Sequence, residues 1–371
     1  MRISSTAEKV RAAGPPSETR AAPKTPLAVS MGDPAGIGLD IILAAWLQRG
    51  ELALPAFVAF ASVAALSERA RLLGLDVPLH TISRVIEASA AVARGLPVID
   101  TPAGAPVTPG RPQPATAPAT LAAIDAAVAA VARGEARAVV TAPIAKSVLY
   151  AAGFGHPGHT EYLGALSRRH WPDQPASPVM MLASDDLRVV PVTIHVPLSA
   201  VPALLTADAI ETTIRITAAE LQKRFSIARP RIAVAGLNPH AGESGTMGSE
   251  EIEIIAPAIA RLCADGLDVR GPLPADTMFH AAARSRYDVA IAMYHDQGLV
   301  PLKTLAFDRA VNVTLGLPFV RTSPDHGTAF DIAGTGRADP ASFIAALRMA
   351  DRMSVDGVSS AVSAVPPAHH G

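Results

Sequence analysis

With 371 residues, 49% of them hydrophobic, the chain can bury a core large enough for two domains, which excludes a small binding peptide. Its 32 basic and 33 acidic side chains nearly cancel, so no overall field draws it to nucleic acid or to an anionic membrane, and a small-molecule partner is favoured. The single cysteine, Cys263, excludes a disulfide framework and a thiolate zinc cluster, and it predicts a cytoplasmic protein.

The two ends of the chain are predicted to be disordered tails, over residues 1–25 and 362–371, because they lack hydrophobic periodicity. The mild excess of Arg and Lys in the first tail leaves targeting as a weaker alternative. We expect no apolar run long enough to cross a membrane and no secretory signal.

The first predicted strand, 26–30, enters a glycine-rich turn and is followed by a helix over 39–47. A proline-rich loop is expected over 101–118. Further strands are expected over 55–62, 77–82, 136–141, 189–194, 231–237 and 287–293, and further helices over 67–73, 119–133 and 249–255. Strands that alternate with helices predict an α/β fold with a largely parallel sheet, and the continuous apolar character of these strands indicates helices on both faces.

Three histidines, His195, His240 and His295, each stand just beyond a predicted buried strand. Ligands of open α/β sheets bind outside the carboxyl ends of the strands, so imidazoles delivered there from separate strands can converge. Three neutral imidazoles with positions left open are typical of a catalytic divalent-metal site. For any one of them alone, a hydrogen-bonded cap of a strand end is the simpler interpretation, but the three together favour a metal.

Other polar residues indicate a site for an anion. His159 and Thr160 follow Gly158 and suit a loop or helix start that binds an anionic group. Further along, Lys303, Asn312 and Arg321 can together neutralise and hydrogen-bond a phosphate. When that run is considered alone, an ordinary solvated face explains it better.

Two glycine-rich stretches can bring backbone close to a ligand. The turn Gly32–Gly38 lies between a strand and a helix but matches neither the dinucleotide-binding nor the Walker pattern, so a tight turn that carries Asp33 into the site is at least as good an interpretation as an anion cradle. The stretch 238–248, with Gly242 and Gly245, fits nucleotide binding and a flexible lid equally well.

Seven motifs follow one another along the chain: Met31-Gly-Asp-Pro-Ala-Gly-Ile-Gly38, Gly158-His-Thr-Glu-Tyr-Leu163, His195-Val-Pro-Leu198, Leu237-Asn-Pro-His-Ala-Gly-Glu243, Gly271-Pro-Leu-Pro-Ala-Asp-Thr277, Tyr294-His-Asp-Gln-Gly298, and the run from Lys303 through Asn312 and Arg321 to Gly334. Their sequences and their order resemble those of the 4-hydroxythreonine-4-phosphate dehydrogenase family over residues 27–355. The family usually has Pro-Glu where this chain has Leu39-Asp40, and Gly where it has Ser244.

The resemblance implies the fold of the isocitrate and isopropylmalate dehydrogenases, two α/β/α domains around a cleft. Domain 1 would comprise residues 26–155 and 310–361, and domain 2 would comprise residues 156–309 with the metal site and the dimer interface. It also implies a homodimer with shared active sites.

The same resemblance implies one divalent ion, zinc, cobalt or magnesium, held by His195, His240 and His295. The substrate and its phosphate would be held by His159, Thr160, Lys303, Asn312 and Arg321. NAD or NADP would bind near Gly242, Gly245, Gly327 and Asp331. Because Asp331 matches a carboxylate that faces the ribose hydroxyls in the isopropylmalate enzymes, NAD is favoured.

The activity implied is the metal-dependent oxidation of 4-phosphooxy-threonine to 2-amino-3-oxo-4-phosphooxybutanoate, which decarboxylates to 3-amino-2-oxopropyl phosphate in pyridoxal 5'-phosphate biosynthesis. A general base is expected among Asp276, Asp296 and Lys303, between which the spacing does not choose. The alternatives are a dehydrogenase of phosphorylated threonate or erythronate, a dehydrogenase of aromatic cis-dihydrodiol carboxylates and, more remotely, a non-catalytic sensor of metal and metabolite.

Overall fold

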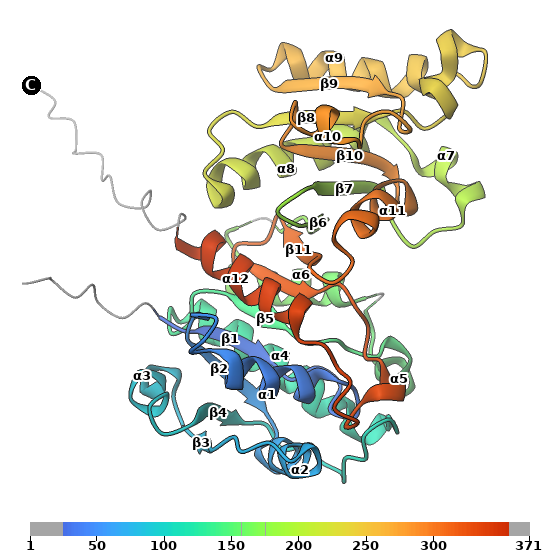
Figure 1. The fold of residues 1–371 in the computed structure, drawn as a ribbon. Coiled ribbons are helices and arrows are strands. Elements are labelled where there is room, and N and C mark those ends of the chain that lie inside the picture. The colour runs from blue at the N-terminus through green and yellow to red at the C-terminus, as the bar shows by residue number, and fades with distance from the viewer. Residues whose placement is uncertain (1–24, 157, 175, 356–371) are drawn as a thin grey trace, which may run out of the picture.

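A single twelve-stranded sheet runs through the protein in the computed structural model, which describes residues 25–156, 158–174 and 176–355 (Figure 1). The two predicted tails lie almost entirely outside the described residues. The strand order is β3-β4-β2-β1-β5-β12-β11-β6-β7-β10-β8-β9. The strands are β1 (Leu27–Ser30), β2 (Phe57–Ala61), β3 (Leu79–Thr81), β4 (Leu96–Asp100), β5 (Val139–Thr141), β6 (Val179–Ala183), β7 (Arg188–Thr193), β8 (Arg231–Ala235), β9 (Asp268–Leu273), β10 (Val289–Tyr294), β11 (Val311–Leu315) and β12 (Arg321–Pro324).

The expected α/β class is confirmed, and the strands at both ends of the sheet pair in parallel as predicted. In the middle, however, β12 pairs with β11, β11 with β6, and β6 with β7 in antiparallel fashion. This reversal makes the strands of the two halves run in opposite directions. The carboxyl ends of β1 and β5 therefore face one edge of the sheet, and those of β7 and β10 face the other.

All seven predicted strands are present, with bounds that differ from the prediction by up to three residues at an end. The predicted loop 101–118 ends early, because a short 3-10 turn at Pro114–Thr116 leads into helix α4 at Ala117. The strands that the sequence analysis missed are β4, β6, β9, β11 and β12.

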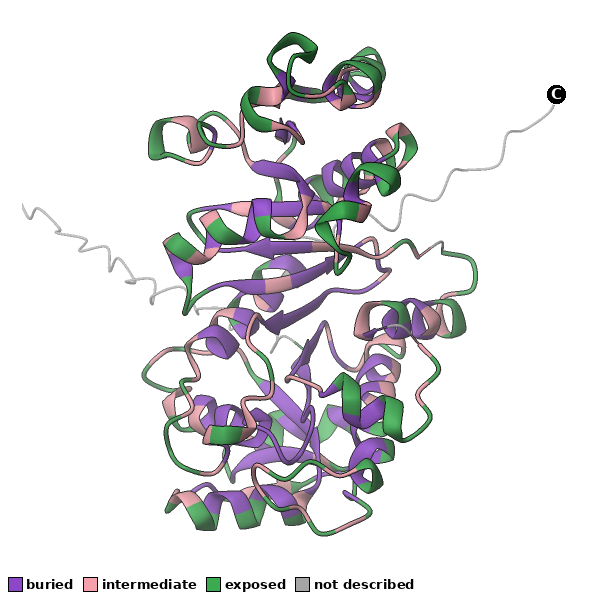
Figure 2. Ribbon diagram, turned by 90° about the vertical axis from the view of Figure 1, so that its right-hand side faces the viewer, coloured by how far each residue is buried: buried purple, intermediate pink, exposed green. Residues whose placement is uncertain are grey.

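Helices cover both faces of the sheet and bury most of its inner strands, whereas the outermost strands β3 and β9 are partly exposed (Figure 2). α12 packs against β11 and β12 on one face, whereas α4 packs against β1, β2 and β5 on the other. The helices are α1 (Gly38–Gln48), α2 (Val63–Leu73), α3 (Ala88–Ala91), α4 (Ala117–Ala132), α5 (Lys146–Ala151), α6 (His159–His170), α7 (Val201–Leu204), α8 (Ala207–Phe225), α9 (Ala256–Ala264), α10 (Ala281–Arg284), α11 (His295–Ala306) and α12 (Ala341–Val355).

One helical segment, Pro114–Ala132, is long and apolar enough by length and composition to cross a membrane, which corrects the expectation that no such run exists. About 50% of its apolar window is nevertheless buried inside the protein. Since α4 also packs against three strands, its apolar character is that of a core helix in an α/β protein.

The glycine-rich turn between β1 and α1 packs closely against neighbouring backbone. A side chain at Gly32 would place its Cβ 2.3 Å from the carbonyl oxygen of Pro143, and one at Gly36 would place it 2.9 Å from that of Thr328. Asp33 is buried and accepts a hydrogen bond from the backbone N–H of Ala35 at 3.0 Å. Of the two interpretations, the tight turn is therefore supported, with Asp33 capping the turn itself.

Behind this turn, Asp40 and Arg69 form a buried ion pair. Arg69 also donates hydrogen bonds to the carbonyl oxygens of Gly36 at 2.9 Å and Pro34 at 3.0 Å, and the second carboxylate oxygen of Asp40 accepts from the N–H of Gly334 at 2.8 Å. The pair thus joins the turn to the loop that follows β12. Asp40 is one of the three residues, with Leu39 and Ser244, at which the chain departs from the motifs of the family that it resembles, and Arg69 is its partner in the structure.

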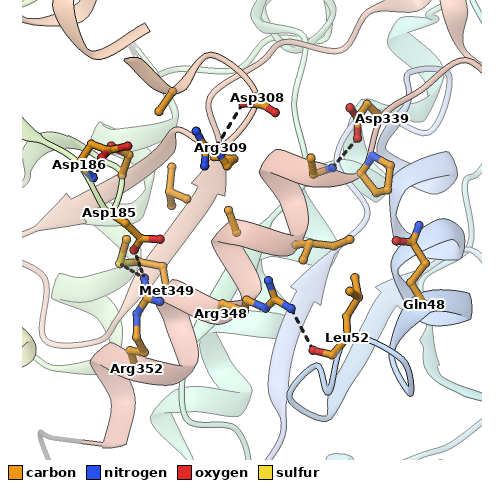
Figure 3. Close-up of a pocket in the computed structure, with 17 residues that line it drawn as sticks. Gln48, Leu52, Asp185, Asp186, Asp308, Arg309, Asp339, Arg348, Met349 and Arg352 are labelled. Atoms are coloured by element: carbon orange, nitrogen blue, oxygen red, sulfur yellow. Dashed lines mark hydrogen bonds and ion pairs between the residues drawn. The ribbon is translucent and has the colours of Figure 1, made fainter. Parts of the chain in front are cut away.

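A cavity of about 420 Å³ lies along α12, between the two halves of the sheet (Figure 3). Several of its charged side chains contact neighbouring protein groups. Arg352 lies 3.4 Å from Asp185, and Arg348 donates to the carbonyl oxygen of Leu52 at 3.0 Å. These contacts connect α12 to the β6–β7 turn and to the segment after α1, so the side chains around the cavity hold the two halves of the sheet together.

The buried pair behind the turn predicts a large loss of stability on Arg69→Ala. Removal of one partner leaves a buried carboxylate unpaired, which costs about 3–5 kcal/mol, whereas an exposed pair is worth less than about 1 kcal/mol. Arg71→Ala is a matched control, because Arg71 pairs with Glu68 at the surface of the same helix. Urea unfolding of both variants measures the difference, and equal losses would contradict the assignment.

Candidate active site

A cavity of about 230 Å³ lies over one face of the central strands. Alternate residues of a strand face the same side, so Arg321 and Ser323 of β12 reach it together. The first turn of α6 and the segment that follows β7 also line the cavity. The polar residues that line it are Thr141, Lys146, His159, Thr160, Glu161, His195, Asn312, Arg321, Ser323 and His326.

Two of the three predicted metal ligands meet beside this cavity. β7 and β10 are parallel neighbours with Thr193 opposite Tyr294, so the residues that follow, His195 and His295, emerge side by side. Their ring centroids are 5.5 Å apart. Asp296 holds Nδ1 of His295 at 2.6 Å, an arrangement that orients an imidazole and leaves its Nε2 for a metal.

His240 does not join this pair. β8 ends at Ala235. The loop that follows has positive φ at His240, Ala241 and Gly242, and the side chain of His240 is exposed. Beside the carboxyl end of β8 lies Gln297 instead. Its side chain accepts a hydrogen bond from the N–H of Met293 and donates one to the carbonyl oxygen of Gly236, both at 2.7 Å. Accordingly, no group of three potential metal ligands forms among the described residues of one chain.

The chemistry of the histidine pair nevertheless fits a divalent ion. Burial lowers the pKa of His195, and the charges of Lys146 and His295 lower it further. A neutral imidazole is the form that ligates a metal. The pair therefore provides two of the three ligands that a catalytic site of this kind requires.

The floor of the cavity is a buried guanidinium. Arg321 is only 5% exposed, and its Nη atoms donate to the hydroxyls of Thr141 at 2.7 Å and Thr314 at 3.0 Å. Its Nη2 also lies 3.2 Å from Nδ1 of His159. Burial lowers the pKa of Arg321 to about 10, so it remains a cation near neutral pH.

The same cavity contains buried nitrogen atoms without a partner among the described residues. They are Nε of Arg321 and the Nε2 atoms of His159 and His326. Burial, with the charges of Arg321 and Lys146, keeps the pKa of His159 well below its usual 6.5, so this ring is neutral. Buried polar atoms are normally hydrogen-bonded. The N–H at Nε of Arg321 and the Nε2 of neutral His159, whose Nδ1 faces the guanidinium, are donors that suit an anionic ligand.

Lys303 lies next to the cavity without lining it. Its ammonium group is 3.0 Å from the carboxylate of Asp325, which directly follows the lining residue Pro324. Burial raises the pKa of Asp325, and Lys303 opposes that rise. The charge of Lys303 is thus paired in the structure, unlike that of Arg321.

The other two candidate bases lie away from the cavity. Asp276 is exposed in the turn after β9, and Asp296 is exposed with its carboxylate bonded to His295. Neither lines the 230 Å³ cavity.

The four predicted cofactor residues fall into two separate places. Gly327 lines the cavity, and Asp331 is exposed in the short 3-10 turn Phe330–Ile332 just beyond it. Gly242 and Gly245 follow β8, which lies five strands from β12, or roughly 24 Å at the usual strand spacing. Within one chain, the two pairs do not face a common ligand.

Sequence reasoning missed several residues of the cavity. Thr141 is the last residue of β5, and Lys146 lies five residues after it. Ser323 belongs to β12, and His326 lies two residues after that strand. The rule that selected the histidines, a polar residue just beyond a predicted strand, does not select Thr141, which lies inside the predicted strand 136–141, or Lys146, which lies five residues beyond it. β12 itself was not predicted, so Ser323 had no strand to locate it.

Comparisons with known proteins show the family to which the chain belongs. A family model described as pyridoxal phosphate biosynthetic protein PdxA matches residues 53–350. The 4-hydroxythreonine-4-phosphate dehydrogenase of Bradyrhizobium diazoefficiens is 58% identical over 337 residues, which are 89% of this chain and 97% of that protein.

Two solved structures show the same fold. The 4-hydroxythreonine-4-phosphate dehydrogenase from Klebsiella pneumoniae matches with a TM-score of 0.79 and 40% identity, over 89% of this chain and 99% of that one. A terephthalate 1,2-cis-dihydrodiol dehydrogenase from Burkholderia xenovorans matches with a TM-score of 0.59 and 30% identity, over 88% and 97%. The chain therefore belongs to the PdxA family, the 4-hydroxythreonine-4-phosphate dehydrogenases, which are oxidoreductases.

Proposed function

We propose that this protein oxidises 4-phosphooxy-threonine to 2-amino-3-oxo-4-phosphooxybutanoate with NAD(P) in pyridoxal 5'-phosphate biosynthesis. The product, a β-keto acid, then loses carbon dioxide to give 3-amino-2-oxopropyl phosphate. The observation that carries the proposal is the buried Arg321, with unpartnered nitrogens around it, in the cavity that His195 also lines. Phosphate and reacting carbon would thus be held within one small cavity.

The phosphate is proposed to bind Arg321, His159, Thr160 and Asn312. Arg321 is held by two threonine hydroxyls, so little conformational entropy is lost when an anion binds it. Such positioning is worth several kcal/mol of the barrier, because the reacting carbon is held in place before reaction. Lys303 is proposed as a further substrate contact at the edge of the cavity.

The metal would be held by His195 and His295 of one chain and by His240 of a second copy. Zinc, cobalt and magnesium are the candidate ions, and such an ion supplies Lewis acidity that makes the substrate hydroxyl more acidic. Asp296 orients His295 for this role. Among the proposed bases, Lys303 is nearest to the cavity, whereas Asp276 and Asp296 remain alternatives.

The second copy is supported by exposed apolar side chains near the histidine pair. Leu198, Leu204 and Val300 are exposed, as are Met247 and Ile252 near His240. A homodimer that covers these side chains removes apolar surface from water and brings His240 to the other chain's pair. We further propose a cytoplasmic location, consistent with the exposed free thiol of Cys263.

NAD(P) is proposed to bind beside Gly327 and Asp331, which adjoin the substrate cavity. Gly327 would let the cofactor approach the backbone, since nothing lies within 4 Å of a side chain placed there. The Asp331 carboxylate would repel a 2′-phosphate, so NAD is the proposed partner. Gly242 and Gly245 would contribute only from another subunit.

The test of this function is an absorbance assay for NADH with the purified protein, a divalent metal and NAD. 4-Phosphooxy-threonine should be oxidised in preference to phosphorylated threonate or erythronate. The similarity to a terephthalate dihydrodiol dehydrogenase makes an aromatic cis-dihydrodiol carboxylate the second candidate substrate. Turnover of that diol alone would overturn the substrate assignment, because the diol carries no phosphate for Arg321 to bind.

Shared metal sites predict complementation between two inactive variants. His195→Ala and His240→Ala should each abolish turnover. When the two chains are co-expressed and pair at random, half of the dimers are mixed and each mixed dimer has one intact site, so about a quarter of wild-type activity should return. No recovery in the mixed dimers would show that His240 and His195 do not act across subunits.

The fixed guanidinium predicts a specific cost for Arg321→Lys. Lysine keeps the charge, but its single nitrogen cannot reproduce the planar fork that spans both threonine hydroxyls and leaves Nε for the phosphate. KM for the phosphorylated substrate should therefore rise about 10- to 100-fold. Arg309→Lys, at an exposed pair with Asp308, is the matched control and should leave KM unchanged. Equal KM values for both variants would exclude Arg321 from phosphate binding.

A further inference from the structure

The substrate cavity contains two permanent positive charges, Arg321 and Lys146, among the described residues that line it. The proposed substrate carries two anionic groups, a phosphate and a carboxylate. Arg321, with His159 beside it, accounts for the phosphate. A carboxylate that enters the same cavity also loses water, and this loss is costly unless a cation or hydrogen-bond donors compensate it.

Lys146 is in the right place to supply that cation. It is the first residue of α5, on the segment after β5, and it lines the same cavity as His195. Its Nζ lies only 3.5 Å from where a Cβ of Gly158 would be, so the ammonium is close to the start of α6. Its charge is also one of the causes that hold down the pKa of the neighbouring His159.

The ammonium group of Lys146 forms no ion pair within the part of the chain that the structure describes. Glu161 also has its carboxylate in this region, with Oε2 2.7 Å from where a Cβ of Gly158 would be. It forms no ion pair with Lys146 among the described residues. Lys303, by contrast, is engaged by Asp325 at 3.0 Å. Lys146 is thus the lysine at this cavity whose charge is open to a ligand.

We propose that Lys146 binds the carboxylate of the substrate, while Arg321 binds its phosphate. This assignment rests on the proposed function and extends it to a second recognition point. Two cations on different elements, β12 and the start of α5, would fix both ends of the substrate and leave the hydroxyl-bearing carbon between them. Lys146 would then select acids over neutral analogues that carry the same phosphate.

The test compares the binding of 4-phosphooxy-threonine and of its carboxamide by titration calorimetry, in the presence of the divalent metal and without NAD, so that no turnover occurs. The wild-type protein should bind the acid about 10- to 100-fold more tightly than the amide. In Lys146→Met the acid should bind that much more weakly, the amide should bind as before, and the preference should vanish. Lys146→Arg should restore much of it.

Lys223→Met, on the exposed side of α8, is the matched control and should retain the wild-type preference. Equal weakening of acid and amide in Lys146→Met would assign Lys146 to the phosphate or to the fold and overturn the proposal. So would an unchanged affinity for the acid. If the wild-type protein oxidises 4-phosphooxy-threonine but binds acid and amide equally, the carboxylate assignment fails while the proposed function stands.

Discussion

The burial of one positive charge, that of Arg321, connects the fold to the chemistry. A guanidinium in the interior is tolerated only where hydrogen bonds satisfy it, and here Thr141 of β5 and Thr314 of β11 do so from the strands on either side. The arrangement holds the three central strands in register around a cation whose Nε still lacks a partner among the described residues. An anion bound there, as proposed, would complete the set, so the same guanidinium that joins the three strands would also select the ligand.

The reversal of strand direction in the middle of the sheet explains why the site lies where it does. A uniformly parallel sheet would gather its functional residues at one edge. Here the carboxyl ends of β5 and β7 face opposite edges, and the site forms over the face of the strands between them. His195 and His295 approach from one half, and Arg321 is presented by the strand that joins the halves. This arrangement requires the whole sheet, so neither half holds a complete site.

Much of this could be predicted from the sequence, because long apolar runs and motif order are local signals. The α/β class, seven strands and the adjacency of His195 and His295 follow from strand patterns alone. The position of His240 could not be predicted, since four residues of irregular loop separate it from β8, and a loop path depends on contacts such as those of Gln297. β11 and β12 escaped notice because they mix Arg, Asn and Thr with apolar residues. The partners of Asp40 and Lys303 are likewise remote in sequence.

The late position of β12 in the chain has a consequence for biosynthesis. β12 pairs with β5 and with β11, yet about 180 residues separate it from β5. While the ribosome synthesises the second half, β5 remains an open edge, and unpaired edges of this kind invite association with other chains. Contacts between such distant segments also slow folding, because the long loop must close before the pairing is gained. The nascent protein is therefore most exposed to misassociation between the synthesis of β5 and that of β12, an interval of roughly 9–36 s at usual rates of synthesis.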